Sequence, residues 1–306
     1  MKDKMYIVMT TLIMGSSLHA QDTIIPLWPE DKIPNRIESD EKEEHINEDI
    51  LRIAKVQQPT IEVYLPSKKN ASGKAMLIFP GGGYGILAYD WEGTDIAKFL
   101  NGKGIAGIVV KYRLPSDKSQ NEKWNVPLID AQRALRLVRS KASDFHIAPD
   151  KIGIIGFSAG GHLASTLGTH FNEKVYEPVD EADMLSARPD FMALVYPVIT
   201  FTQSTKHSGS QKNLLGDNPP EDLLKHFSNE LQVTAETPPT FLVHATDDGG
   251  VPVENSLLFF QALKDKGVSA TMHIYPKGGH GFSLALKDPH LRGWTERLFE
   301  WTESLD

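Results

Sequence analysis

The sequence predicts an α/β fold whose central sheet is mostly parallel and carries helices on both faces. Three observations support this fold class. Apolar runs of strand length alternate with helical patterns through most of the chain, several of these runs are apolar throughout, and a Gly-x-Ser-x-Gly lies between one such run and a helix. Strands buried on both faces are typical of parallel sheets, because helices cover both sides. With 306 residues and 40% hydrophobic content, the chain can form one large core.

The strands and helices can be placed in chain order from these patterns. The first apolar run alternates in polarity with a period of two, which predicts an antiparallel strand, whereas the later runs are apolar almost throughout. Helices between parallel strands act as right-handed crossovers. The predicted strands are 59–66, 74–79, 105–113, 151–155, 191–196, 240–244 and 268–275, and the predicted helices are 92–100, 128–141, 161–167, 253–266 and 293–305.

Two segments do not follow this alternation. Residues 21–49 are polar and rich in charge, with several prolines in the first part, so we expect an irregular arm on the surface. Residues 201–233 contain polar loops and a short helix near 221–224, and we expect an insertion that overhangs the functional site as a partial lid. No internal repeat or low-complexity linker is present, and residues 21–306 are predicted to form a single domain.

Charge and the N-terminal pattern bear on partners and location. The net charge of −8, with no block of Lys or Arg, gives no electrostatic reason to expect nucleic acid or an anionic membrane as a partner. Residues 1–20 resemble a secretory signal peptide: Lys2 and Lys4 precede a short apolar stretch at 6–14, and small residues lead to Ala20. The stretch is too short to span a bilayer, so we expect export to the periplasm or beyond, without stable membrane insertion. The chain has no cysteine and therefore no disulfide.

The sequence Gly-Phe-Ser-Ala-Gly at 156–160 lies between a strand and a helix, which is the pattern of a nucleophile elbow. In an elbow the turn is so sharp that the serine is strained and its hydroxyl exposed, and larger side chains two positions to either side would collide with the neighbouring strand or helix. This interpretation makes Ser158 a nucleophile that attacks a carbonyl carbon. The alternative is a glycine-rich turn that binds phosphate at a helix N-terminus.

A serine nucleophile needs a base, and the base needs a carboxylate that orients it, in the chain order Ser, Asp or Glu, His. Asp247 and Asp248 both follow the strand 240–244, and we choose Asp248 because the Asp-x-x-Val-Pro turn can aim it over the sheet edge, while Asp247 caps the turn. His280 lies between glycines after the last strand and is the predicted base. The other histidines fit less well. His162 lies on the helix after the serine and His244 lies on a strand. Three more precede the carboxylate in the chain: His170, His207 and His226.

The sequence Phe-Pro-Gly-Gly-Gly-Tyr-Gly at 79–85 predicts an oxyanion hole, because its glycines allow backbone N–H groups to converge on an anion. We assign Gly82 and Gly83 as donors, together with the N–H of Ala159 directly after the nucleophile. No Lys-Ser/Thr pair follows the glycines, which excludes a P-loop. No His-Glu-x-x-His or similar ligand spacing is present, and we expect neither a metal nor another cofactor.

Taken together, four motifs resemble the α/β-hydrolase esterases that include bacterial acetyl xylan esterases and feruloyl esterases, a group related to the hormone-sensitive-lipase type. The motifs are Pro-Gly-Gly-Gly-Tyr, Gly-Phe-Ser-Ala-Gly-Gly-His, His-Ala-Thr-Asp-Asp-Gly-Gly-Val-Pro and Gly-Gly-His-Gly-Phe. The resemblance implies a cofactor-free serine carboxylesterase that acts on acylated plant polysaccharide, with Ser158, Asp248 and His280 as nucleophile, acid and base. The chain departs from the lipase-type relatives at Pro80, where they carry histidine.

The expected activity is hydrolysis of short acyl esters, above all acetyl, on a carbohydrate such as acetylated xylan. Tyr84 is assigned to the substrate pocket, and Trp91 and Trp124 are further candidates for stacking against a sugar or a feruloyl ring. Three alternatives are a feruloyl esterase, a peptidase of the prolyl-oligopeptidase type and a non-catalytic binding protein. The chain has no room for the gating propeller of such a peptidase, and a triad member is typically missing from such a binding protein.

Overall fold

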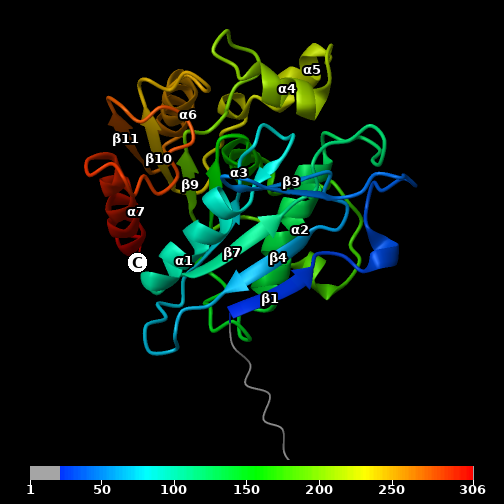
Figure 1. Cartoon of the computed structure of the whole chain (residues 1–306), viewed down its shortest axis with the longest axis horizontal. Coiled ribbons are helices and arrows are strands. Elements are labelled where there is room, and N and C mark those ends of the chain that lie inside the picture. The colour runs from blue at the N-terminus through cyan, green and yellow to red at the C-terminus, as the bar shows by residue number, and fades with distance from the viewer. Residues whose placement is uncertain (1–20, 306) are drawn as a thin grey trace, which may run out of the picture.

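The computed structural model describes residues 21–305 and contains an eight-stranded sheet at its centre (Figure 1). Its first two pairings are antiparallel and the remaining five are parallel. The mostly parallel sheet predicted from the sequence is therefore confirmed. In spatial order the strands are β1 (Gln21–Pro26), β4 (Thr60–Tyr64), β7 (Ala106–Lys111), β5 (Ala75–Phe79), β8 (Ile152–Phe157), β9 (Met192–Val195), β10 (Thr240–Ala245) and β11 (Ala270–Tyr275).

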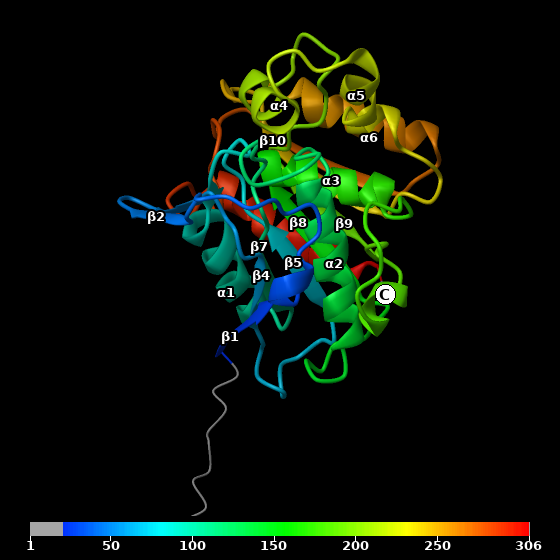
Figure 2. The ribbon, with the colours of Figure 1, turned by 90° about the vertical axis from the view of Figure 1, so that its right-hand side faces the viewer.

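Helices cover both faces of the sheet, as predicted. Helix α1 lies on one side of the strands in Figure 2, and α2 and α3 lie on the other. The ion pair between Lys103 and Glu296 joins the end of α1 to α7, so these two helices share a face. The helices are α1 (Asp95–Gly102), α2 (Val126–Ser140), α3 (Ala159–His170), α4 (Ser208–Leu215), α5 (Glu221–His226), α6 (Glu254–Asp265) and α7 (Trp294–Glu303), with a π-helix at Asp90–Thr94 and short 3-10 turns at Glu30–Lys32, Glu181–Met184, Asn229–Leu231 and Leu291–Gly293.

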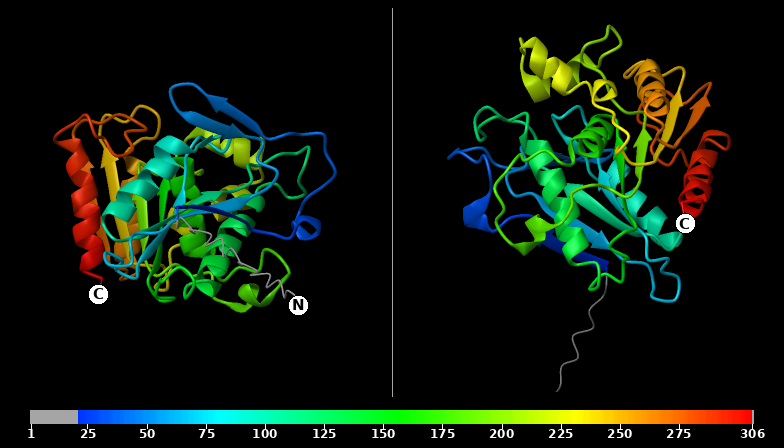
Figure 3. Two further views of the ribbon diagram at one scale, coloured as in Figure 1. Left: turned by 60° about the horizontal axis from the view of Figure 1, so that its bottom comes forward. Right: turned by 180° about the vertical axis from the view of Figure 1, so that it is seen from behind.

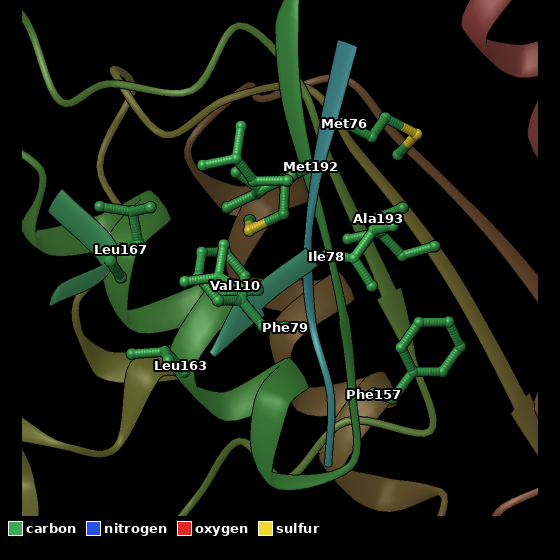
Figure 4. Packing of buried hydrophobic residues seen from close by; sticks show 14 of the residues in the cluster. Met76, Ile78, Phe79, Val110, Phe157, Leu163, Leu167, Met192 and Ala193 are labelled. Atoms are coloured by element: carbon green, nitrogen blue, oxygen red, sulfur yellow. The ribbon is translucent and has the colours of Figure 1, made fainter. Parts of the chain in front are cut away.

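The central strands are buried along their whole length, which explains their apolar sequences. Every residue of β5, β8, β9 and β10 is buried. Leu163 and Leu167 of α3 lie on the same side of the sheet as Met192, while Phe157 points to the opposite side (Figure 4). Burial of each such side chain contributes about 1.5–3 kcal/mol. The core therefore fixes the strand ends from which the site residues project.

The segment 21–49 is more regular than its polar sequence indicates. Its first residues form β1, which pairs antiparallel with β4 at the edge of the main sheet, where Ile24 is 60% exposed. Further along, β2 (Glu44–Asn47), β3 (Leu51–Ala54) and β6 (Leu87–Ala88) form a separate three-stranded sheet (Figure 3). The expectation of an irregular arm is wrong for these strands, because edge and surface strands need little apolar sequence and obtain their hydrogen bonds from distant partners.

Residues 201–233 form α4, α5 and the loops around them, which lie at one end of the molecule over α3 (Figures 1 and 2). Helix α4 was not anticipated, because its sequence is polar and only three of its residues are buried. Its Asn213 side chain donates to the carbonyl of Gly83 at 2.8 Å, so the insertion contacts the predicted oxyanion loop. That the segment serves as a partial lid over the site stays a prediction.

The signal peptide predicted at residues 1–20 lies outside the described residues. Within the described part of the chain, no helix combines the length and the apolar character required to cross a membrane.

Candidate active site

Ser158 lies at the junction of β8 and α3 in a strained backbone conformation. Its φ is 52° and its ψ −117°, an arrangement that non-glycine residues rarely adopt. A Cβ atom at Gly156 would lie 2.2 Å from the carbonyl oxygen of Gly160, and one at Gly160 would lie 2.0 Å from the carbonyl oxygen of Phe79. The turn thus tolerates only glycine at both positions, as the elbow interpretation requires.

The structure brings Ser158, His280 and Asp248 together from three separate strand ends. His280 Nε2 lies 2.8 Å from Ser158 Oγ, and His280 Nδ1 lies 2.7 Å from Asp248 Oδ2. The carboxylate side chain is fully buried, while the imidazole is 29% exposed. A carboxylate accepts from Nδ1–H, which leaves the Nε2 lone pair directed at the serine hydroxyl. This tautomer can remove a proton from Ser158.

Asp248 is held as an anion by several donors. Its Oδ1 accepts hydrogen bonds from the N–H groups of Gly250 and Val251 at 2.9 and 2.8 Å. Burial opposes ionisation of this group, but the hydrogen bonds from His244 and His280 hold its pKa well below its usual range. The carboxylate therefore stays charged and can stabilise a protonated His280.

Asp247 has a different role from its neighbour. Its Oδ1 accepts from the N–H groups of Gly278 and Gly279 at 2.9 and 2.8 Å, so it ties the loop that carries His280 to the end of β10. The sequence-based choice between the two aspartates agrees with this geometry, although the turn that Asp247 caps belongs to the neighbouring loop.

His244 is a second imidazole on Asp248 that the sequence analysis assigned only to a strand. Its Nε2 lies 3.2 Å from Asp248 Oδ2 and 2.9 Å from the carbonyl oxygen of Val251, and its Nδ1 lies 2.8 Å from Ser256 Oγ. Both neighbours of Nε2 only accept, so Nε2 carries the hydrogen. A histidine in an otherwise apolar strand, four residues before an aspartate, is the signal that could have indicated this pairing.

The predicted oxyanion donors lie around Ser158. Gly82, Gly83 and Ser158 line the same cavity, and Ala159 is the first residue of α3. The N–H groups of Gly82 and Gly83 have no hydrogen-bond acceptor among residues 21–305. Gly82 adopts a φ of 127°, which a side chain would not tolerate. These donors are therefore available to an anion beside the serine.

A buried glutamate, which the sequence analysis missed, supports this loop. Glu92 Oε2 accepts from Gly81 N–H at 2.9 Å, and its Oε1 accepts from the Tyr196 hydroxyl at 2.8 Å. Tyr196 in turn accepts from the N–H of Ser283 at 3.0 Å. Burial raises the pKa of Glu92. One carboxylate thus connects the glycine loop, the end of β9 and the loop that carries His280.

The cavity in front of Ser158 has a volume of about 660 Å³. Trp91 lines it and is 37% exposed, whereas Trp124 packs partly buried against the core. Two parts of the chain far from the motifs also contribute to the cavity, the turn between β2 and β3 and the loop before α4. Its lining residues are Asp49, Ile50, Gly82, Gly83, Ala88, Trp91, Glu92, Ser158, His207, His280 and Gly281.

Tyr84 does not line this cavity, so its assignment to the substrate pocket is corrected. The side chain is 2% exposed, and its hydroxyl lies 2.9 Å from His162 Nδ1. The backbone of Tyr84 has a φ of 61°, and its ring packs edge-on against His162 of α3, with the two ring centroids 5.7 Å apart. His162 also contacts the carbonyl oxygen of Phe227 at 2.8 Å, and burial lowers its pKa to about 4, so this histidine has a structural role.

Comparisons with known proteins agree with this geometry. The chain is 37% identical over 237 residues to endo-1,4-β-xylanase B of Butyrivibrio fibrisolvens. The matched region covers 78% of this chain and 36% of that protein. It is 35% identical over 247 residues to an acetylxylan esterase of Xylanibacter ruminicola, covering 79% of this chain and 47% of the relative. The chain thus spans less than half the length of these curated relatives.

A solved structure matches over nearly the full length of both chains. It is an acetyl ester-xyloside bifunctional hydrolase from Caldicellulosiruptor lactoaceticus, with a TM-score of 0.80, 38% identity, and coverage of 95% of this chain and 98% of that one. A carboxylesterase from Lactobacillus plantarum, at 22% identity and a TM-score of 0.68, shares the fold. The sequence model of the BD-FAE family matches residues 61–263. The chain therefore belongs to the BD-FAE family of α/β-hydrolase esterases.

Proposed function

We propose that this protein is a serine carboxylesterase that removes acetyl groups from plant polysaccharide such as acetylated xylan. The observation that carries the proposal is the unbroken series of hydrogen bonds from Asp248 through His280 to Ser158, at 2.7 and 2.8 Å. The relatives named for acetyl ester and acetylxylan hydrolysis support the substrate class.

In the first step His280 Nε2 takes the proton of Ser158 as Oγ attacks the ester carbonyl carbon. Asp248 keeps Nδ1 protonated and stabilises the imidazolium that forms. Asp248 also accepts hydrogen bonds from two N–H groups of its own turn, and these bonds help to keep the carboxylate charged during proton transfer. His280 then delivers the proton to the leaving alcohol, which breaks the ester bond and leaves an acyl group on Ser158.

The tetrahedral intermediate places a negative charge on the former carbonyl oxygen. The N–H groups of Gly82, Gly83 and Ala159 are assigned to this oxygen, and one such donor contributes about 3 kcal/mol to the transition state. Glu92 holds Gly81 and so fixes the loop before any substrate arrives. Water, activated by His280, then attacks the acyl-enzyme, and acetate leaves.

The cavity wall supports a carbohydrate as the alcohol part of the ester. Trp91 offers a partly exposed ring, held by a hydrogen bond of 2.9 Å from its Nε1 to the carbonyl oxygen of Gly281 in the His280 loop. Such a ring presents a rigid apolar face to the C–H groups of a sugar. Asp49 adds a carboxylate at the rim, on the turn between β2 and β3.

Acetate release from acetylated xylan tests the proposal. We expect the wild type to release acetate from the polymer and to hydrolyse 4-nitrophenyl acetate faster than the butyryl ester or a feruloyl ester, and we expect Ser158→Ala to do neither. Trp91→Ala is expected to raise KM for the polymer by about tenfold while leaving 4-nitrophenyl acetate hydrolysis nearly unchanged. A preference for feruloyl esters, or for peptide substrates, with no acetate released from the polymer, would contradict the substrate assignment.

We also propose that the protein is exported by the signal peptide predicted at residues 1–20. Mass spectrometry of the protein recovered from periplasmic and extracellular fractions of its host is expected to show an N-terminus at Gln21. Recovery of the uncleaved chain from the cytoplasm alone would contradict this.

A further inference from the structure

Two histidines and a glutamate meet at the end of α3 that is remote from Ser158. His170 is the last residue of α3, Glu173 lies in the turn after it, and His226 is the last residue of α5 in the insertion. One potential ligand atom from each lies within 4.8 Å of the others, and His226 Nε2 is 3.6 Å from Glu173 Oε2. Figure 2 shows α5 over this part of α3. No step of the proposed esterase reaction uses these residues.

His170 has a buried nitrogen without a partner. The residue is 8% exposed, and its Nε2 forms no hydrogen bond with any described residue. Its Nδ1 lies 3.1 Å from the carbonyl oxygen of Thr166, which can only accept, so Nδ1 carries the hydrogen and Nε2 carries a lone pair. The Thr169 hydroxyl fits this tautomer, because it donates to the carbonyl of Ser165 and can therefore accept from His170 Nδ1. An unpaired buried polar atom lowers the stability of the folded state, and a ligand bound to Nε2 would remove this cost.

The donors around this nitrogen are those that zinc prefers. Two imidazoles and one carboxylate form a common set for Zn²⁺, with water in the fourth position. The contact from His170 Nδ1 to a backbone carbonyl is the usual support for a metal-bound histidine.

The surroundings hold two of the ligands in place and favour a cation. Gln132 donates to the backbone carbonyls of His170 and Glu173, both at 3.0 Å, and so fixes the turn that carries them. The site lies at the C-terminus of α3, where the helix dipole attracts positive charge. Ligand atoms on a tetrahedral zinc ion are about 3.3 Å apart. The ligand atoms here lie within 4.8 Å of one another. The Glu173 and His226 side chains are 39% and 33% exposed and can move inward to close the difference of about 1.5 Å.

We propose that His170, Glu173 and His226 bind one divalent transition-metal ion, of which Zn²⁺ suits the donors best. The ion would join α5 of the insertion to the end of α3. It would thereby stabilise the base of the insertion, while α4 contacts the glycine loop through Asn213. The proposed role of the ion is to join these two elements, at the end of α3 remote from Ser158.

The test uses the full chain, stripped of metal by a chelator and then titrated with Zn²⁺ alone in a calorimeter. We expect one ion per chain and a rise of roughly 4 °C in melting temperature at saturating Zn²⁺. Co²⁺ in place of Zn²⁺ is expected to give visible absorption bands from the bound ion. His226→Gln and Glu173→Gln, both on partly exposed side chains, are each expected to weaken binding by about 100-fold and to remove the bands.

The matched control is His45→Gln. His45 Nε2 also lies beside a carboxylate, 2.7 Å from Glu43 Oε1, but on the surface. This variant is expected to bind Zn²⁺ as the wild type does. The proposal is overturned if the wild type binds no Zn²⁺ at 100 µM, or if His226→Gln and Glu173→Gln, shown to be folded by circular dichroism, bind it as tightly as the wild type.

Discussion

The two ends of helix α3 carry the same kinds of side chain and yet differ in chemistry. At its N-terminus Ser158 meets an imidazole and a carboxylate, and at its C-terminus His170 meets a second imidazole and a carboxylate. The helix has 12 residues, so its ends are about 18 Å apart. At the first end the imidazole has a partner on both nitrogens. At the second, the buried Nε2 of His170 has no hydrogen-bond partner within residues 21–305.

The difference follows from what each helix end offers. The first turn of a helix presents N–H groups without partners and favours negative charge, whereas the last turn presents carbonyl groups and favours positive charge. Ala159 can therefore donate to a developing oxyanion, while the end at His170 suits a cation. The same residue types thus support anion stabilisation at one end and, in our proposal, metal binding at the other.

Removal of the nucleophile at the N-terminal end of α3 is expected to have the largest effect on esterase activity. Ser158→Ala is expected to lower kcat for 4-nitrophenyl acetate by about 10⁵-fold, because no other hydroxyl among residues 21–305 donates to His280 Nε2. Ser208→Ala, an exposed serine at the start of α4, is the matched control and should retain full activity. Loss of less than tenfold in Ser158→Ala would assign the chemistry to another residue.

Variants of the two neighbouring aspartates test which carboxylate orients His280 at the Ser158 end of α3. Asp248→Asn is expected to lower kcat by about 10⁴-fold, because an amide no longer stabilises the imidazolium or selects its tautomer. Asp247→Ala removes only the acceptor of the Gly278 and Gly279 N–H groups, so a loss of about tenfold is expected. Steady-state kinetics on one substrate check both variants. Equal losses would show that the loop anchor and the orienting carboxylate cannot be separated.

The glycine loop gives a third pair of variants. A Cβ at Gly82 would lie 2.2 Å from the carbonyl oxygen of Ile86, whereas one at Gly83 would contact only His207 Cε1 at 3.9 Å. Gly82→Ala is therefore expected to displace the oxyanion donors and lower kcat by about 100-fold. Gly83→Ala is expected to cost less than tenfold, because a φ of 62° strains alanine only modestly. The reverse order would contradict the loop geometry.

His162 is expected to make the folding stability depend on acid. Burial lowers the pKa of His162, within α3, to about 4, against about 6.5 in an unfolded chain. Between these values the unfolded state binds more protons, so stability is fully present above pH 6.5 and is lost as the pH falls towards 4. The loss from His162 alone is up to about 3 kcal/mol. Urea unfolding at pH 7.5 and 4.5 should show it, and His162→Gln should reduce the difference between the two pH values; an unchanged difference would contradict the assignment.

The central sheet and the residues around Ser158 could be predicted because their signals are local. Strands that are buried on both faces must be apolar along their length, and the elbow and the glycine loop require glycine at fixed positions for steric reasons. The choice of Asp248 over Asp247 also followed from local turn chemistry. These features depend on neighbours in the sequence.

The parts that could not be predicted depend on distant partners. Strand β1 obtains its hydrogen bonds from β4, and the turn at Asp49 reaches the cavity only because β2 and β3 form a separate sheet. Glu92 is one acidic residue on a helical segment until Gly81 and Tyr196 are placed beside it. The wrong assignment of Tyr84 has the same origin, since its ring direction is set by His162.

Covalent labelling of Ser158 is the most direct test of the central claim that the N-terminus of α3 carries the nucleophile. The reagent is a 4-nitrophenyl phosphonate ester, which transfers one phosphonyl group to an activated serine and releases one 4-nitrophenol. We expect one adduct per chain, located at Ser158 by peptide mass spectrometry, with esterase activity lost in proportion to labelling. An unmodified Ser158 in fully inactivated protein, or ester hydrolysis that continues after complete labelling of Ser158, would contradict the account.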